Sequence, residues 1–283
     1  MFMKIEQPFD LSATLSSGQV FRWKREGETW HGLISNNLVS LELSGNVLKY
    51  KTTMNPSKKM EDLITKYFRL DDNLPGIQAS LDWDFRLSQA IGALGGLRLI
   101  RQDPWECLIS FICSSNSNIS RISRIMNSIA QGFGDKITLG SLVGFQFPGP
   151  NILASIGEVG FRELKLGYRA EYVDKTAKIL ADNQMDLNEL KSLPYFKAKA
   201  WLMALPGVGA KVADCVLLFS LDKLESFPID VWVRRAIEEW YFNGEQLSYE
   251  KLAQWAADYF GPYAGYAQQY LFHHRRTGEF SGS

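Results

Sequence analysis

The first fifty residues alternate between apolar and polar side chains. Val39, Leu41 and Leu43, for example, alternate with Ser40 and Glu42. A period of two is typical of strands that bury one face of a sheet. The stretches "EGE", "NN" and "SGN" separate these runs and are typical of tight turns. The sequence therefore predicts an antiparallel sheet near the N-terminus.

From Asp103 onward the apolar positions recur with the period of an α-helix. In "DPWECLISFIC", Asp103 is placed to cap a helix, Pro104 suits the first turn, and an apolar stripe runs from Trp105 to Ile112. A second apolar stripe follows and ends near Gly134. Most of the remaining chain shows the same period, with breaks at proline and glycine. The second part of the chain is therefore predicted to be helical.

These patterns together predict an α+β protein. We expect an N-terminal antiparallel β-sheet domain over residues 1–100 and a mostly α-helical region over residues 101–283, with two helices joined by a tight turn at about 195–221. The chain has 283 residues, of which 46% are hydrophobic and 22% charged. This composition is ordinary for a globular protein with a sizeable core.

Charge and cysteine content narrow the classes of function. The formal net charge is zero, so nucleic-acid binding has to depend on local geometry rather than on an overall basic field. The three cysteines, Cys107, Cys113 and Cys215, match neither a disulfide framework nor a zinc site. The N-terminal "MFMKIEQPFDL" is charged before any long apolar run, which is unlike a signal peptide or membrane anchor. We expect an intracellular protein, cytoplasmic or, in a eukaryote, nuclear.

Several candidate catalytic and binding residues lie close together in the stretch "LPGVGAKVADCV". After Pro206, the turn Gly207, Val208, Gly209 leaves backbone N–H groups unpaired at the start of a helix, where they can bind an anion such as phosphate. A P-loop would end in Gly-Lys-Ser or Gly-Lys-Thr, and a dinucleotide fingerprint would have a third glycine after a strand. Neither pattern is present. The remaining alternative is a helical corner whose glycines serve packing alone.

Lys211 lies in the first turn of this helix, beside its apolar stripe. The helix dipole and partial desolvation both favour a neutral amine there, and a neutral amine is a nucleophile. Such a nucleophile needs a carboxylate nearby. Asp230, in "FPIDVWV", is the better candidate, although it is equally suited to be only a helix N-cap. Asp214 fits a simple salt bridge with the lysine three residues before it.

The whole stretch "LPGVGAKVADCVLLFSLDKLESFPIDVWV" resembles the helix-hairpin-helix Gly/Pro–Asp signature of base-excision DNA glycosylases. The stretches "LSSGQVFRWK", "DPWECLISFICSSNSNISRI", "LGYRAEYV" and "GYAQQYLF" extend the likeness to 8-oxoguanine DNA glycosylases, over nearly the whole chain. The resemblance implies a DNA repair enzyme that flips out and removes 8-oxoguanine, preferably opposite cytosine, and then cleaves the abasic strand. Lys211 would be the nucleophile, and Asp230 would stabilise the transition state. The partner would be double-stranded DNA containing oxidised guanine, and we expect a monomer.

The same resemblance assigns the remaining site residues. It implies that the damaged base is bound by Gly18, Cys215, Gln268 and Phe272, and that the opposite base and the DNA are bound by Asn116, Arg121, Tyr168, Arg169, Gly207, Val208 and Gly209. Backbone carbonyls of Met203, Leu205 and Val208 resemble a site for a monovalent cation or calcium. No cofactor is expected to be required, and the four-cysteine loop of iron–sulfur relatives is absent from the sequence. Without the resemblance, these side chains would be ordinary core or surface residues.

The sequence departs from the family pattern at two places. Trp232 stands where the eukaryotic pattern has histidine, and Ser117 interrupts an asparagine triplet. Because the net charge is zero, we also predict a local basic face formed by Arg121, Arg169, Arg275 and Arg276. Two other functions stay open at this point. One is an alkylated-base glycosylase, against which Lys211 and Gly18 argue, and the other is a non-catalytic DNA-binding module.

Overall fold

The computed structural model describes residues 1–54, 57–183 and 186–277. Its N-terminal part is a five-stranded antiparallel sheet with the strand order β1-β5-β4-β3-β2. The strands are β1 (Phe2–Lys4), β2 (Lys24–Glu26), β3 (Thr29–Ile34), β4 (Asn37–Ser44) and β5 (Val47–Thr52). Leu41 pairs with Trp30 on one side and Tyr50 on the other, and all three side chains are buried. The predicted sheet is therefore confirmed.

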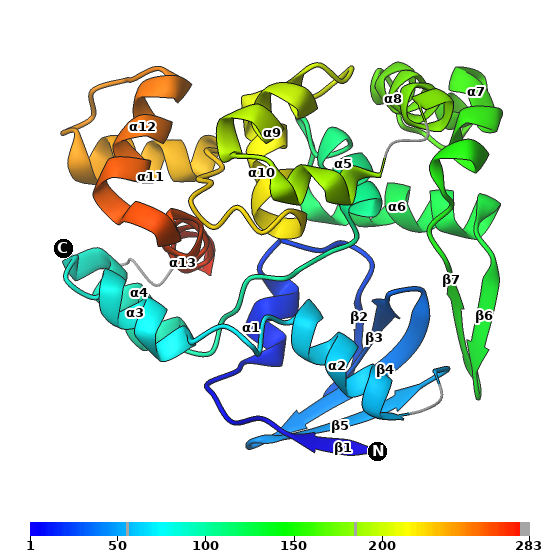
Figure 1. Ribbon diagram of the computed structural model, residues 1–283, viewed down its shortest axis with the longest axis horizontal. Helices are drawn as coiled ribbons and strands as arrows, with labels where there is room; N and C mark the ends of the chain where they lie inside the picture. The colour runs from blue at the N-terminus through cyan, green and yellow to red at the C-terminus, as the bar shows by residue number, and fades with distance from the viewer. Residues whose placement is uncertain (55–56, 184–185, 278–283) are drawn as a thin grey trace.

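Helices make up most of the remaining chain (Figure 1). They are α1 (Leu11–Ser16), α2 (Ser57–Tyr67), α3 (Leu74–Leu81), α4 (Phe85–Leu94), α5 (Pro104–Ile112), α6 (Ile119–Phe133), α7 (Pro150–Glu163), α8 (Arg169–Asn183), α9 (Tyr195–Met203), α10 (Ala210–Ser220), α11 (Val231–Tyr241), α12 (Tyr249–Phe260) and α13 (Ala264–Thr277), with short 3-10 helices η1 (Leu187–Ser192) and η2 (Gly261–Tyr263). Asp103 caps α5 by accepting a hydrogen bond from the Glu106 amide at 2.9 Å, and Gly134 follows the end of α6, as predicted.

Some elements were not predicted from the sequence. Helices α1, α2, α3 and α4 lie within the first hundred residues, where only a sheet was predicted, and a two-stranded hairpin of β6 (Lys136–Leu139) and β7 (Leu142–Phe145) interrupts the helical region. The hairpin extends toward the sheet domain, where β6 packs against β4 (Figure 1). Its strands have four residues each, too short for a clear local pattern, and the packing of β6 on β4 supports them.

The buried apolar side chains form two cores. The smaller core joins one face of the sheet to α2 and includes Leu41, Tyr50 and Ile64. The larger core lies among the helices and also takes in Leu74 and Leu87 from α3 and α4. Residues 74–94 thus pack with the later helices, with α4 against α13, although they precede the boundary that we predicted at residue 100. Within the described ranges, no helix combines the length and apolarity that a membrane crossing needs.

His273 is a buried histidine on α13, and only 5% of it is exposed. Burial, helped by the positive charges of Arg276 and His274 and opposed by Asp10, lowers its pKa from 6.5 to about 4. Between pH 4 and pH 6.5, His273 is largely protonated in the unfolded chain but not in the folded protein. The free energy of unfolding is therefore expected to fall as the pH drops from 6.5 to 4, by about 3 kcal/mol in total from this one group.

This pH dependence can be measured by urea unfolding at pH 7 and pH 4.5. His273→Gln removes the titrating group, so its stability is expected to change less between the two pH values than that of the wild type. Equal losses of stability in the two proteins would contradict the assignment to His273.

Candidate active site

The turn between α9 and α10 has the tight conformation that the sequence predicted. Gly207 has φ +78°, and a Cβ atom there would lie 2.7 Å from the side chain of Tyr172, so only glycine fits. Thr176 on α8 donates a hydrogen bond to the Pro206 carbonyl at 3.1 Å and fastens the turn. Gly209 caps α10 without a side-chain hydrogen bond. The first amides of α10 are therefore available to bind an anion.

Lys211 is the second residue of α10 and is half-buried. Its Nζ atom lies 3.0 Å from Ser114 Oγ and 5.2 Å from the ring centroid of Phe111. Ser114 Oγ also lies 2.7 Å from the Phe111 carbonyl, to which it donates its proton. The hydroxyl oxygen can therefore only accept from the lysine, and it fixes where the amine lies. No local pattern marks Ser114 or Phe111 as partners of Lys211, because they lie about a hundred residues before it in the sequence.

Cys215 lies within electrostatic reach of both Lys211 and Asp230. Burial raises the pKa of the Cys215 thiol to about 12, while the positive charge of Lys211 opposes that shift and the negative charge of Asp230 adds to it. The thiol is therefore uncharged at neutral pH. Asp230 caps α11 by accepting from the Val233 amide at 2.8 Å. Asp230 is thus an N-cap and also places a negative charge beside the Lys211 region.

Asp214 does not pair with Lys211, which contradicts the sequence expectation. Its side chain is fully buried, and Lys199 on α9 lies 2.7 Å from its Oδ2 atom. The hydroxyls of Tyr195 and Tyr249 donate to the same carboxylate at 2.7 Å each. The Asp214 carboxylate therefore fastens α10 to α9 and leaves the lysine amine to Ser114.

A second group of predicted residues meets where α13 passes the segment around Gly18. Gly18 has φ +83°, and a Cβ atom there would lie 3.3 Å from Ile119 and 3.4 Å from Phe272. Gln268, one turn before Phe272 on α13, is 5% exposed. Its Oε1 atom is buried and accepts no hydrogen bond from the described residues. A buried acceptor without a donor is costly, and a bound ligand would satisfy it.

Gln102 joins the segment around Gly18 to the lysine helix. Its side-chain amide donates to the Gln19 carbonyl at 2.9 Å, and its backbone amide donates to the Phe219 carbonyl at 2.8 Å. Phe219 belongs to α10. The structure therefore connects the predicted base-binding segment to the helix that bears the predicted nucleophile.

The residues expected to contact the opposite strand form a third group around the loop after α5. Tyr168 is 47% exposed, and its hydroxyl donates to the Ser115 carbonyl at 2.9 Å. Arg169 is only 1% exposed and donates to the carbonyls of Ser115 and Asn116. Arg121 lies beside the loop at Gly167 and, unlike Arg169, is exposed.

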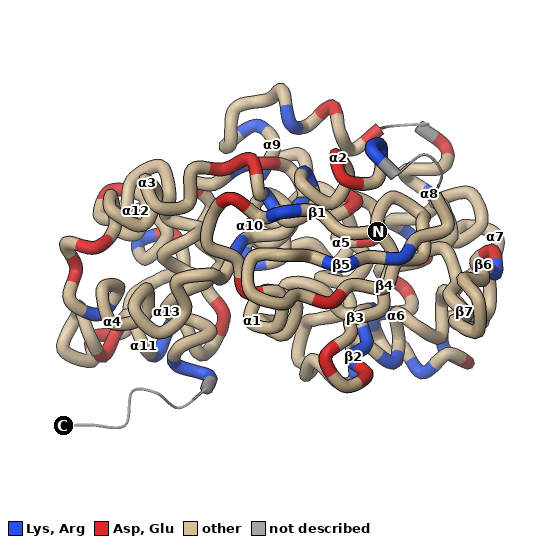
Figure 2. The backbone as a smooth tube through the Cα atoms, turned by 90° about the horizontal axis from the view of Figure 1, so that it is seen from below, with Lys and Arg blue, Asp and Glu red and all other residues tan. Residues whose placement is uncertain are grey.

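The predicted basic face is wrong in its composition. Arg169 is buried, Arg275 pairs with Glu239 at 3.0 Å, and Arg276 donates to the Ser16 carbonyl at 2.5 Å. Figure 2 shows Lys and Arg positions interspersed with Asp and Glu along the chain. A local excess of positive charge exists instead along α6, in a groove whose charged lining residues are Lys24, Arg121, Arg124, Lys165 and the single acid Glu163. Positions on three separate segments create this groove, which is why sequence patterns missed it.

A hollow of about 980 Å³ lies elsewhere, between the sheet domain and the helices. Its lining includes Trp23, Tyr67 and Trp105 but not Lys211, Asp230 or Cys215. We assign the active site to the lysine region because the candidate nucleophile lies there beside anion-binding amides and the charge of Asp230 reaches Cys215 on the same helix, whereas the volume of a hollow alone implies no chemistry.

The two departures from the family pattern have distinct surroundings. Trp232 is 52% exposed in the first turn of α11, two residues after Asp230. Ser117 has a buried Oγ atom without a hydrogen-bond partner among the described residues. Its neighbour Asn118 caps α6 by accepting from the Arg121 amide at 2.9 Å. The loop thus keeps its capping asparagine despite the serine.

Ser114→Ala is expected to slow reactions that depend on the Lys211 amine. Loss of one hydrogen bond of about 1.4 kcal/mol corresponds to a rate about tenfold lower. The measurement is the initial rate of borohydride trapping on a duplex that already contains an abasic site, so that base recognition plays no part. Ser114→Thr keeps the hydroxyl and is expected to restore most of the rate. Trapping by Ser114→Ala at the wild-type rate would contradict the role assigned to this contact.

Comparison with known proteins identifies the family of the chain. Residues 1–108 match the family described as 8-oxoguanine DNA glycosylase, N-terminal domain, and residues 109–262 match the HhH-GPD superfamily base excision DNA repair proteins. The chain is 34% identical over 280 residues to N-glycosylase/DNA lyase OGG1 of Arabidopsis thaliana, covering 93% of this chain and 76% of the plant protein.

Two solved structures share the whole fold. MBOgg1, in complex with a low affinity DNA ligand, superposes with a TM-score of 0.93 at 32% identity and covers 98% of this chain and 95% of its own. The 8-oxoguanine glycosylase/lyase of Clostridium acetobutylicum, in complex with double-stranded DNA containing cytosine opposite 8-oxoguanine, superposes with a TM-score of 0.91 at 29% identity over 99% of each chain. The chain therefore belongs to the HhH-GPD superfamily of base excision DNA repair proteins, in the 8-oxoguanine DNA glycosylase family.

Proposed function

We propose that this protein binds double-stranded DNA, removes 8-oxoguanine paired with cytosine, and cleaves the resulting abasic strand. The observation that supports this most directly is the position of Lys211, whose amine is held by Ser114 on a helix that begins at an anion-binding turn. The named N-glycosylase/DNA lyase relative and the DNA complexes of the two structural neighbours support the same reaction.

In the proposed reaction the Lys211 amine attacks C1′ of the flipped nucleotide. The bond from C1′ to the base nitrogen breaks, and its electron pair leaves with the base. The lysine nitrogen gives up one proton, which the departing base takes up. Its lone pair then expels the ring oxygen O4′, which is protonated, and a protonated Schiff base forms at C1′. Loss of a proton from C2′ drives β-elimination, in which the C3′–oxygen bond breaks and the 3′ phosphate leaves with its electron pair. Asp230 places a negative charge near the positive charge that develops on the sugar, which lowers the energy of the transition state.

Recognition of the damaged base is proposed to depend on Gly18, Gln268, Phe272 and Cys215. Flipping costs a few kcal/mol, which contacts in the pocket must offset. The Gly18 carbonyl would accept from the N7 hydrogen that 8-oxoguanine has and guanine lacks. The unpaired Oε1 atom of Gln268 would accept a second hydrogen bond from the base. The partly exposed Phe272 ring offers a surface for stacking.

The opposite strand is proposed to lie along the third group of residues. Arg121 is exposed and has the geometry for bidentate recognition of a base edge. Tyr168 would fill the place that the flipped base leaves in the stack. Arg169 differs from its predicted role in this structure, because its guanidinium holds the carbonyl of Asn116 and so shapes the loop. Phosphates would bind at the amides that follow Gly209 and along the basic groove of α6.

We propose that the protein needs no cofactor. We also propose that it is a monomer and that it acts in the compartment that contains the DNA.

A monovalent cation or calcium is proposed to bind at the turn between α9 and α10. The carbonyls of Met203, Leu205 and Val208 belong to the C-terminal end of α9 and the following turn. Leu205 already accepts a hydrogen bond from the Val208 amide at 3.2 Å, so a cation would share this oxygen.

The experiment that tests this function uses a duplex with one 8-oxoguanine opposite cytosine, in EDTA. We expect base release followed by strand cleavage, and neither reaction on undamaged DNA or on DNA with an alkylated adenine. Release of the alkylated base alone would favour an alkylated-base glycosylase. Tight binding of every duplex without any cleavage would instead indicate a non-catalytic binding module.

A further inference from the structure

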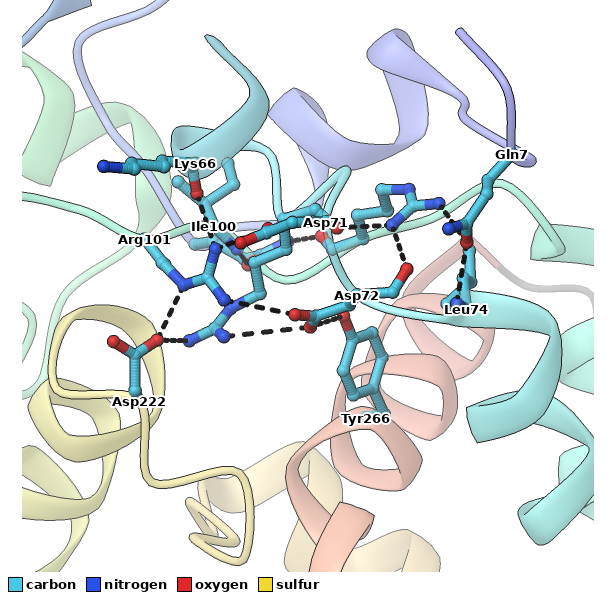
Figure 3. Close-up of polar contacts among 12 residues, drawn as sticks. Gln7, Lys66, Asp71, Asp72, Leu74, Ile100, Arg101, Asp222 and Tyr266 are labelled. Carbon is cyan, nitrogen blue, oxygen red and sulfur yellow. Dashed lines mark hydrogen bonds and ion pairs between the residues drawn. The ribbon is translucent and has the colours of Figure 1, made fainter. Parts of the chain in front are cut away.

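Arginine and aspartate side chains form a partly buried cluster between the sheet domain and the helices (Figure 3). We call it the Arg–Asp cluster, and its members are Arg69, Arg98, Arg101, Asp71, Asp72 and Asp222. Arg69 is 1% exposed and Arg98 is 0% exposed. Charges this deeply buried are costly unless they are paired, so the geometry of the cluster is strongly constrained.

One side of the cluster holds the helix of the nucleophile. Asp222 follows the end of α10 by two residues, in a left-handed conformation with φ +59°. Its Oδ1 atom lies 2.6 Å from Arg69 Nη2 and 2.8 Å from Arg101 Nε. Burial acts to raise the pKa of Asp222, but the two arginines outweigh it and the pKa lies below its usual value. The carboxylate therefore stays charged and anchors the C-terminal end of α10.

A second side holds the helix of the base-binding residues. The hydroxyl of Tyr266 on α13 donates to Asp72 Oδ2 at 2.9 Å, and Arg101 Nη2 lies 3.1 Å from Asp72 Oδ1. Tyr266 is fully buried, and burial together with the charge of Asp72 raises its pKa well above the usual value. Tyr266 therefore remains a donor. It lies two residues before Gln268, so Asp72 anchors the helical turn of α13 from which Gln268 projects on another face.

A third side reaches the residue next to Gly18. The Arg98 guanidinium donates to the Arg69 carbonyl at 2.5 Å. The Arg98 carbonyl accepts from Gln19 Nε2 at 2.8 Å, and the Ile100 amide donates to Gln19 Oε1 at 2.9 Å. Gln19 is fully buried, so its position is set by these contacts. The segment around Gly18, α10 and α13 are thus all attached to one cluster.

We propose that Asp72 is a positioning residue for base excision. Its carboxylate holds α13 through Tyr266 and α10 through Arg101 and Asp222, and its backbone carbonyl accepts from Arg98 Nη1 at 3.4 Å, so that it keeps the three elements at the separation that a flipped 8-oxoguanine requires. The inference rests on the proposed function. Base release needs all three elements together, since Gly18 and α13 bind the base while Lys211 attacks the sugar. Cleavage of a strand that is already abasic needs Lys211 but no base contacts. Because a misplacement of about 1 Å can cost about 100-fold in rate, loosening Asp72 affects the first reaction selectively.

The test compares Asp72→Asn and Tyr266→Phe with the wild type in three measurements. These are single-turnover release of 8-oxoguanine opposite cytosine, cleavage of a duplex with a preformed abasic site, and thermal unfolding. We expect release to fall at least about tenfold in both variants and abasic cleavage to change less than about twofold. Tyr266→Phe removes one hydroxyl and no charge, so it remains informative even if Asp72→Asn fails to fold.

Asp71→Asn is the matched control. Asp71 belongs to the same cluster and contacts Arg101 Nη1 at 2.6 Å. Its side chain is 46% exposed, however, and the neighbouring Asp72, not Asp71, contacts Tyr266. Both rates are expected to stay within about twofold of the wild type. The double variant of Asp72→Asn with Tyr266→Phe is expected to resemble Asp72→Asn alone, because the two changes remove one shared contact.

Two results would overturn the inference while the proposed function stands. In the first, the wild type releases 8-oxoguanine and the variants release it equally fast. In the second, release and abasic cleavage fall together in proportion to the unfolded fraction, which would mean that the cluster only stabilises the fold. A wild type that cleaves abasic DNA but releases no 8-oxoguanine would overturn the proposed function and this inference with it.

Discussion

Lys211→Gln is expected to abolish base release and borohydride trapping while DNA binding stays within about twofold of the wild type. Removal of a covalent nucleophile typically lowers rates by about four orders of magnitude or more. Glutamine has a similar length and keeps a polar group near Ser114, but its amide nitrogen has no nucleophilic lone pair. The anion-binding amides of the turn are backbone groups and remain in place.

The measurement pairs gel-based trapping on the 8-oxoguanine duplex with a binding titration of the same duplex. Lys58→Gln is the matched control, because Lys58 is exposed on α2 in the sheet domain. This variant should trap and bind like the wild type. Trapping by Lys211→Gln at more than a trace level would show that another amine forms the Schiff base, and the assignment of Lys211 would then be wrong.

Asp230→Asn is expected to lower the rate of base release by about 100- to 1,000-fold with little change in thermal stability. The charge of Asp230 is felt at Cys215, beside Lys211, and loss of one preorganised electrostatic contact typically costs this much. The N-cap is expected to survive, because asparagine caps helices about as well as aspartate does. Single-turnover kinetics and thermal unfolding of the same preparation separate the two roles.

Asp230→Ala separates the two roles of this carboxylate further. It removes both the charge and the hydrogen bond to the Val233 amide, so we expect the same loss of rate and, in addition, a loss of about 1 kcal/mol in the free energy of unfolding. If Asp230→Asn is fully active and only Asp230→Ala is impaired, Asp230 is a helix cap alone. That is the alternative that the sequence left open.

The parts of the fold that depend on local spacing were predictable. The strands of the sheet, the cap at Asp103 and the end of α6 at Gly134 each follow from the residues within one or two turns. The turn at Gly207 and the capping position of Asp230 were predictable for the same reason. In each case the signal and the structure it produces lie in the same short segment.

Contacts between distant segments have no comparable local signal. The contact of Lys211 with Ser114 joins residues 97 positions apart, and the packing of α4 on α13 joins the two halves of the chain. The sequence around Arg169 does not show whether its side chain faces solvent or a loop. In the folded chain the side chain is buried and donates to the Asn116 carbonyl. Asp214 was spaced to pair with Lys211, yet Lys199 lies closer in the folded chain.

The sequence by itself thus determined the class of fold, the family, and the identity of the candidate nucleophile and carboxylate, because short motifs and the local periodicity encode them. Tertiary structure decided which groups hold the lysine amine, which arginine is free to meet DNA, and which charges connect the three elements of the base site. These outcomes depend on tertiary packing, within the helical core for Lys211 and Arg169 and between the sheet domain and the helices for the Arg–Asp cluster (Figure 3). Packing brings distant side chains within hydrogen-bonding distance, and no pattern along a single segment contains that information.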